Sequence, residues 1–261
     1  KSALLAGLAP HGRAVLNADD PHLRALAATS GARALRFGRS SDADVRADRI
    51  RETGEGLFFE LALPEGRTEV RLRAFGRFMV SNALAAAAAG YALGLDIADI
   101  RQGLEAFTPV AGRLSVADLP GGIHLIDDTY NANPASMEGA IATLNHLRGD
   151  ARGLLVLGDM RELGAAAGAL HRDAGLQAAR SGASKLLVCG DFAGEVAAGA
   201  RRGGMPTADI VTGSRAEIQA ALLRELKHGD WVLIKGSRAM GMETVVRTLQ
   251  GGPEPQRPSG N

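Results

Sequence analysis

The segment from Ile123 to Arg148 constrains the fold more than any other part of the sequence. A short apolar run ends in the two carboxylates Asp127 and Asp128, and a polar turn then leads to Asn133-Pro134. Asparagine is a favoured N-cap residue and proline is favoured at the first helical position, so a helix is expected to begin there. Beyond it, apolar residues recur at helical spacing: Met137, Ala140, Ile141, Leu144 and Leu147. The segment therefore predicts a strand, a loop and a helix that lies on a sheet.

The same alternation of strand and helix recurs through the rest of the C-terminal half. Strands are expected over residues 153–158, 185–189, 209–212 and 230–235, each followed by a helical stretch. Short apolar strands that alternate with helices indicate an α/β fold with a Rossmann-like, mostly parallel sheet covered on both faces. Ligands bind such sheets at the carboxyl ends of the strands. That edge is predicted to carry Asp128, Asp159, Asp191, Thr212 and the K-G-S-R segment at 235–238.

The N-terminal part shows a different pattern. Arg13 to Asn17 predicts a strand that turns into a helix near Pro21, and the polar–apolar alternation from Ala34 to Phe75 predicts antiparallel strands with one polar face. Residues 76–107 predict two helices. The Pro- and Gly-containing segment 109–116 is the expected hinge between a first domain, 1–111, and a second domain, 112–250. The Pro/Gly-rich residues 251–261 are expected to be a disordered tail.

Composition limits the possible partners. Lys and Arg number 30 and Asp and Glu number 29, so bulk charge favours neither a nucleic-acid nor an acidic-membrane partner. No apolar run approaches the roughly 20 residues of a membrane span. The single cysteine, Cys189, excludes an internal disulfide and is predicted to be a core residue at a strand end. A cytoplasmic monomer is expected.

Five segments carry a resemblance to a known family. They are N-A-D-D-P at 17–21, G-R-L at 112–114, D-D-T-Y-N-A-N-P-A-S-M at 127–137, L-G-D-M-R-E-L-G at 157–164 and K-G-S-R at 235–238. In order and type they resemble the Mur ligases, and within that family the enzymes that add D-alanyl-D-alanine to UDP-N-acetylmuramoyl-tripeptide. The resemblance implies an ATP- and Mg²⁺-dependent ligase of peptidoglycan precursor synthesis. It also implies that the chain is the later part of a central ATP-binding domain followed by the C-terminal domain.

The resemblance also implies roles for particular residues. The residues expected at the adenine and ribose are Asn17, Asp20 and Asn82. Arg113 and Asp128 are expected at the ATP ribose and phosphates. The residues expected to bind the amine substrate and the acyl phosphate are Tyr130, Asn131, Asn133 and Ser237. Lys1 is expected to help hold magnesium if it is carbamylated, because an ammonium group offers no acceptor to a metal ion.

The sequence departs from the family pattern in two places. The segment Gly76 to Asn82 resembles G-R-H-N-x-x-N, but Phe78 and Met79 replace the usual His and Asn. The sequence also contains no Gly-Lys pair, and therefore no phosphate loop of the form G-x-x-x-x-G-K-[ST]. We therefore expect no ligase turnover from this chain by itself.

Several alternatives stay open at this stage. A dinucleotide-dependent oxidoreductase would suit the Rossmann-like pattern, but no G-x-G-x-x-G follows a predicted strand. A non-catalytic nucleotide-binding module would need the same purine pocket. Asp and Asn at strand ends are also ordinary turn and capping residues. Among related ligases, the enzymes that add the third peptide residue and the folyl-polyglutamate ligases are the nearest rivals, although Y-N-A-N-P and G-D-M-x-E-L-G favour the dipeptide-adding enzymes.

Overall fold

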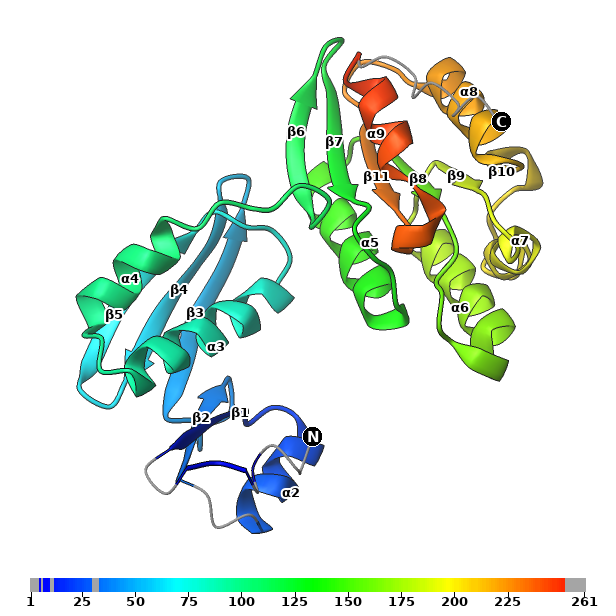
Figure 1. Ribbon diagram of the computed structural model, residues 1–261. Helices are drawn as coiled ribbons and strands as arrows, with labels where there is room; N and C mark the ends of the chain where they lie inside the picture. The colour runs from blue at the N-terminus through cyan, green and yellow to red at the C-terminus, as the bar shows by residue number, and fades with distance from the viewer. Residues whose placement is uncertain (1–4, 6, 10–11, 30–32, 252–261) are drawn as a thin grey trace, which may run out of the picture. The chain divides into compact units, whose positions relative to one another are not determined.

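The computed structural model describes residues 5, 7–9, 12–29 and 33–251 (Figure 1). The chain divides into two compact units, Lys1–Thr108 and Pro109–Asn261. We call them unit 1 and unit 2 and describe each by itself. The predicted domain boundary lay between residues 111 and 112. Lys1 and residues 252–261 of the predicted tail lie outside the described residues.

Unit 1 is built on a five-stranded sheet in the order β1-β2-β3-β4-β5. Its strands are β1 (Arg13–Asn17), β2 (Arg33–Gly38), β3 (Val45–Thr53), β4 (Gly56–Leu63) and β5 (Gly66–Leu72). The predicted antiparallel pattern is confirmed for β3, β4 and β5. It is wrong for β2, which runs parallel to both of its neighbours. The helix α2 (Pro21–Thr29) forms the crossover that a parallel β1–β2 pair needs.

One face of the unit 1 sheet is buried beneath two helices, α3 (Phe78–Ala92) and α4 (Ile97–Glu105). Alternate residues of β4 point into this core, including Leu57, Phe59 and Leu61. The residues between them, Phe58 and Glu60, are only partly buried, as expected for the polar face of an antiparallel sheet. The predicted helices at 76–107 are therefore confirmed.

Unit 2 contains a six-stranded sheet in the order β10-β9-β8-β11-β7-β6. Its strands are β6 (Ser115–Leu119), β7 (Ile123–Asp128), β8 (Gly153–Leu157), β9 (Lys185–Val188), β10 (Ile210–Thr212) and β11 (Trp231–Lys235). All neighbours are parallel except the edge hairpin β6–β7. The mostly parallel Rossmann-like sheet is confirmed, and its carboxyl ends meet at one edge.

Helices follow the strands of unit 2. They are α5 (Pro134–Arg148), α6 (Ala167–Arg180), α7 (Ala193–Arg202), α8 (Arg215–Glu225) and α9 (Glu243–Leu249), with short 3₁₀ turns η1 (Gly164–Ala166), η2 (Thr207–Asp209) and η3 (Arg238–Met240). Cys189 is buried, as predicted, in a core cluster with residues of α8 and α9. Helices α6 and α7 meet at two glycines: a Cβ on Gly175 would lie 1.9 Å from the carbonyl oxygen of Val196, and one on Gly199 would lie 1.8 Å from that of Arg172.

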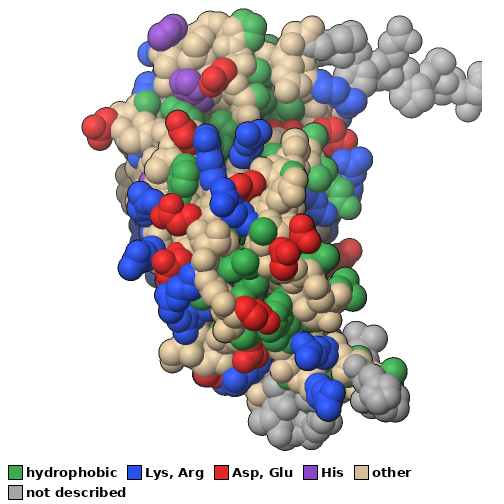
Figure 2. Space-filling view, turned by 90° about the vertical axis from the view of Figure 1, so that its left-hand side faces the viewer, with side chains coloured by type: hydrophobic (Ala, Val, Ile, Leu, Met, Phe, Trp, Pro, Cys, Tyr) green, Lys and Arg blue, Asp and Glu red, His purple; other side chains and the backbone are tan. Residues whose placement is uncertain are grey.

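The surface carries charges of both signs. Figure 2 shows basic and acidic side chains interspersed on the face that it presents. This distribution agrees with the near balance of 30 basic and 29 acidic residues in the sequence. None of the described helices is long and apolar enough to cross a membrane.

Candidate active site

Two carboxylates at the end of β7 fix the segment that precedes β6. Asp127 accepts hydrogen bonds from the backbone N–H of Gly112 at 3.1 Å and from the hydroxyl of Thr129 at 2.7 Å. Asp128 accepts one from the backbone N–H of Leu114 at 3.1 Å. Gly112 has a φ of 77°, and a Cβ there would lie 3.2 Å from the backbone nitrogen of Tyr130. The G-R-L segment is therefore held in one conformation against the β7–α5 loop.

Arg113 is presented by this fixed segment. Its guanidinium carbon lies 4.0 Å from the ring centroid of Tyr130, and that of Arg238 lies 5.9 Å from the same centroid. Tyr130 is 45% exposed. Two guanidinium groups therefore share one exposed aromatic ring at the carboxyl edge of the sheet, although like charges repel each other. A guanidinium binds phosphate or carboxylate oxygens in a bidentate manner, so this edge is suited to an anion.

A buried ion pair lies directly behind that edge. The Lys235 ammonium, which is 1% exposed, donates to Asp128 Oδ2 at 2.5 Å and to the carbonyl oxygen of Asn131 at 2.9 Å. Burial raises the pKa of Asp128 against the opposing effect of the Lys235 charge, and burial lowers the pKa of Lys235. The pair joins β11 to the β7–α5 loop, and breaking it would leave an uncompensated buried charge.

Ser237 and Asn133 are engaged in bonds within the protein. The buried Ser237 hydroxyl accepts the backbone N–H of Arg161 at 2.8 Å and donates to the carbonyl oxygen of Ala132 at 3.4 Å. It thereby connects the loops that follow β7, β8 and β11. Asn133 caps α5, as its position before Pro134 predicted, and forms a capping box with Ser136.

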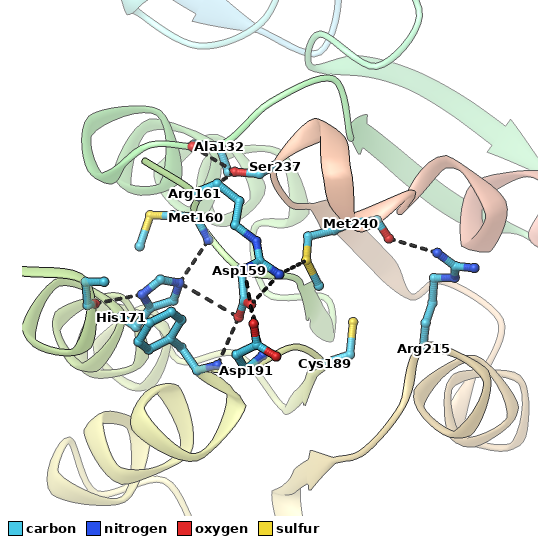
Figure 3. Close-up of polar contacts among 12 residues, drawn as sticks. Ala132, Asp159, Met160, Arg161, His171, Cys189, Asp191, Arg215, Ser237 and Met240 are labelled. Carbon is cyan, nitrogen blue, oxygen red and sulfur yellow. Dashed lines mark hydrogen bonds and ion pairs between the residues drawn. The ribbon is translucent and has the colours of Figure 1, made fainter. Parts of the chain in front are cut away.

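The loop after β8 is organised around Asp159, which is 1% exposed (Figure 3). Its carboxylate accepts the backbone N–H groups of Asp191 at 2.9 Å and Phe192 at 3.1 Å. His171 accepts the backbone N–H of Met160 at its Nε2, 2.9 Å away, so its proton is on Nδ1, which donates to the carbonyl oxygen of Ala167 at 2.7 Å. His171 therefore supports this loop.

Arg161 extends across the same loop. Its guanidinium lies 3.4 Å from Asp159 and 3.1 Å from Asp191. Figure 3 shows this guanidinium between the two carboxylates and the sulfur of Met240. Its charge is therefore offset by two acidic groups, whereas Arg238 has one carboxylate nearby, Glu243 at 3.9 Å, and Arg113 has none among the described residues.

In unit 1, the polar residues after β1 make local turn contacts. Asn17 accepts the backbone N–H of Asp19 at 2.9 Å, and Asp20 accepts the N–H of His22 at 2.8 Å at the start of α2. The Asp19 carboxylate accepts the N–H groups of Arg39 at 2.8 Å and Ser40 at 3.0 Å. Among the described residues, these contacts engage the side-chain oxygen of Asn17 and not its amide nitrogen.

Asn82 lies at an apolar groove of about 290 Å³ between α3 and α4. Its amide nitrogen is 3.4 Å from the sulfur of Met79, which also lines the groove. Phe78 is 44% exposed and is not among the lining residues. Of the two residues that replace the usual His and Asn, only Met79 therefore lines this groove.

The structure brings together most of the residues predicted for unit 2. Arg113, Asp128, Tyr130 and Asn131 are linked at the carboxyl edge by the contacts above, and Ser237 lies behind them. Three residues of this edge had no role predicted from the sequence: Lys235, Arg238 and Asp127. The K-G-S-R segment was placed at this edge from the sequence, but a binding role was predicted only for its Ser237.

Comparison with known proteins gives consistent matches over most of the chain. The profile of the Mur ligase middle domain matches residues 1–90, and that of the Mur ligase glutamate ligase domain matches residues 112–238. A relative from Mycobacterium bovis, named UDP-N-acetylmuramoyl-tripeptide--D-alanyl-D-alanine ligase, is 38% identical over 92% of this chain and 51% of its own length. The chain spans about half the length of the curated relatives it matches.

Solved structures of Mur ligases also superpose on most of this chain. MurF from Acinetobacter baumannii superposes with a TM-score of 0.84 at 30% identity, covering 96% of this chain and 55% of that one. MurF ligase from Thermotoga maritima in complex with ADP superposes with a TM-score of 0.75 at 25% identity, covering 92% of this chain and 53% of that one.

Proposed function

The chain belongs to the Mur ligase family, and from that premise we propose that it forms part of an ATP-dependent ligase that adds D-alanyl-D-alanine to UDP-N-acetylmuramoyl-tripeptide in the cytoplasm. Membership of this family removes the dinucleotide-dependent oxidoreductase from the hypotheses. The names of the Mycobacterium bovis and Acinetobacter baumannii relatives support the dipeptide-adding reaction over addition of the third peptide residue. The observation on which the proposal rests is the fixed Arg113 beside Tyr130 and Arg238.

The proposed reaction has two steps. The tripeptide carboxylate attacks the γ-phosphoryl group of ATP, which releases ADP and leaves an acyl phosphate. The free amine of D-alanyl-D-alanine then attacks the acyl carbon, an amide bond forms and phosphate leaves. In both steps cationic side chains lower the barrier by offsetting negative charge on the phosphoryl group.

We assign the cationic role in unit 2 to Arg113, with Arg238 as a second guanidinium beside the same ring. Asp128 uses one carboxylate oxygen for Leu114 and the other for Lys235. We therefore propose that Asp128 positions the Arg113 segment. Tyr130 and Asn131 are proposed to contact the substrates, whereas Ser237 and Asn133 hold the loops on which those residues lie.

In unit 1 we propose that Asn82 and Asn17 read the purine, because an amide offers both a donor and an acceptor to a base edge. The apolar groove beside Asn82 suits a flat ring. Asp20 is proposed for the ribose. Among the described residues no group of three or more His, Cys, Asp or Glu could hold a metal ion. We therefore assign no magnesium ligand there, and the role of Lys1 stays a prediction.

Binding measurements test the proposal. We expect the chain to bind Mg·ATP and D-alanyl-D-alanine in calorimetric titrations, without release of ADP or phosphate. Arg113→Gln should weaken ATP binding about tenfold, as loss of one charge-assisted contact predicts. Arg224→Gln removes an exposed guanidinium on α8 and should leave ATP binding unchanged.

Two other outcomes would change the interpretation. ATP binding without any response to D-alanyl-D-alanine would favour the non-catalytic nucleotide-binding module. A ligase rate from this chain would contradict the expectation that turnover needs a phosphate loop.

A further inference from the structure

A second cationic site lies in unit 1, apart from the residues assigned above. It is a hollow of about 330 Å³ lined by Arg39, Ala47, Asp48, Arg49, Ile50 and Arg77. Its three arginines come from three segments: the loop after β2, the middle of β3 and the start of α3 (Figure 1). Ligand pockets begin at roughly this size.

The charges of these arginines are poorly offset. Within the described part of the chain, neither the Arg39 nor the Arg77 guanidinium pairs with a carboxylate. Arg49 lies 3.7 Å from Glu60, but its side chain is 81% exposed, and such surface pairs stabilise little. The one acidic residue of the lining, Asp48, is itself paired with Arg46 at 3.3 Å and Arg67 at 3.5 Å. The hollow therefore keeps an excess of positive charge.

Backbone contacts hold the segments that carry Arg39 and Arg77. The Arg39 N–H is bound by Asp19 at 2.8 Å. Arg77 follows Gly76, whose N–H donates to Glu52 of β3 at 2.7 Å. These contacts fix the loop after β2 and the start of α3. The backbone positions of Arg39 and Arg77 are therefore set before any ligand arrives, which reduces the entropy cost of binding.

Arg49 adds an independent observation. It lies in a β-bulge, where the register with β4 shifts between Asp48 and Arg51, and its φ is 51°. A left-handed conformation is unfavourable at a residue with a side chain, and bulges redirect side chains beside functional sites. Glycine would adopt this conformation without that cost. An arginine at this position is therefore difficult to explain by folding alone.

We propose that the hollow formed by Arg39, Arg49 and Arg77 binds a phosphate-bearing anion. A carboxylate is satisfied by one guanidinium, whereas three guanidiniums on separate segments suit the many oxygens and the multiple charge of a diphosphate. The phosphate tail of a nucleotide and a separate phosphorylated compound share this chemistry.

Titration of the chain with inorganic pyrophosphate tests the site. We expect saturable binding that weakens as salt is raised. Arg39→Gln and Arg77→Gln should each weaken binding about tenfold. Arg49→Gly should also weaken it, yet raise the melting temperature because the backbone strain is relieved. The matched control is Arg73→Gln, an exposed arginine outside the lining, which should bind pyrophosphate normally. Absence of pyrophosphate binding, or an equal loss in Arg73→Gln, would overturn the proposal.

Competition identifies the source of the phosphate. If ATP displaces pyrophosphate and Arg77→Gln weakens ATP but not adenosine binding, the anion is the tail of the nucleotide. If ATP and pyrophosphate bind together, the site serves a separate phosphorylated compound. A chain that binds pyrophosphate but neither ATP nor D-alanyl-D-alanine would contradict the ligase proposal and leave the anion site standing.

Discussion

Each unit contains an aspartate whose carboxylate accepts two consecutive backbone N–H groups, but the two aspartates are buried to different extents. In unit 1, Asp19 lies two residues after β1 and accepts the N–H groups of Arg39 and Ser40, which follow Gly38 on the neighbouring strand. In unit 2, Asp159 lies two residues after β8 and accepts two N–H groups that follow Gly190.

The surroundings of the two aspartates differ. The contacts of Asp19 are exposed to water, whereas the Asp159 side chain is 1% exposed. Water can replace the carboxylate in unit 1 but cannot easily do so in unit 2. The same contact should therefore contribute little to stability in one unit and much in the other.

The largest expected effect on stability comes from substituting the two aspartates, one at a time. Asp159→Ala leaves two partly buried N–H groups without their acceptor and takes one carboxylate from Arg161, so it should lower the free energy of unfolding of unit 2 by about 3 kcal/mol. Asp19→Ala should cost less than about 1 kcal/mol, because water hydrates the freed groups. The single tryptophan, Trp231 in β11, reports urea unfolding of unit 2, and hydrogen exchange of Arg39 and Ser40 reports the contact in unit 1. Equal losses would show that burial does not distinguish the two contacts.

A smaller effect on stability is expected at Gly190 and Gly38, the glycines that precede these pairs of N–H groups. A Cβ on Gly190 would lie 2.3 Å from Asp159, at a φ of 117°. Gly190→Ala should therefore destabilise unit 2 by about 2–3 kcal/mol. A Cβ on Gly38 would lie 2.8 Å from Asp19, which can move into water, so Gly38→Ala should cost about 1 kcal/mol. As a control, Gly194→Ala in α7 meets no atom within 4 Å and should be neutral or stabilising. Melting temperatures of the three variants give the ranking.

An effect that is absent at neutral pH and develops only in alkali concerns Cys189, next to Gly190. Burial, together with the charge of Asp159, raises the pKa of the Cys189 thiol to about 11. The unfolded chain then loses this proton at lower pH than the folded chain. The stabilising contribution is therefore present below about pH 9 and is lost as pH rises toward 11, by on the order of 2 kcal/mol.

Urea titrations followed by Trp231 fluorescence between pH 8 and 11 measure this loss. Cys189→Ala has no thiol to titrate and should show a shallower alkaline slope. An identical slope in both proteins would show that Cys189 does not contribute. Burial also predicts that the thiol reacts with iodoacetamide only after unfolding.

The sequence by itself determined the sheet of unit 2, because short apolar strands that alternate with amphipathic helices allow few other arrangements. It likewise predicted the start of α5, because the capping preference of Asn133-Pro134 depends only on residues within the first helical turn. The family motifs at 127–137, 157–164 and 235–238 lie at the carboxyl edge of that sheet, as the sequence predicted. For β2 the same reasoning failed, because strand direction depends on which strand it meets, and a residue pattern carries no direction.

Tertiary structure alone decided how the polar residues are used. Ser237 and Asp128 were identified as site residues, but only their neighbours show that the Ser237 hydroxyl joins three loops and that both Asp128 oxygens are taken. The gathering of Arg39, Arg49 and Arg77 joins residues 38 positions apart through a bulge that no local pattern announces. Hydrogen bonding and burial depend on distant partners, so the chemistry of each side chain is set only once the chain has folded.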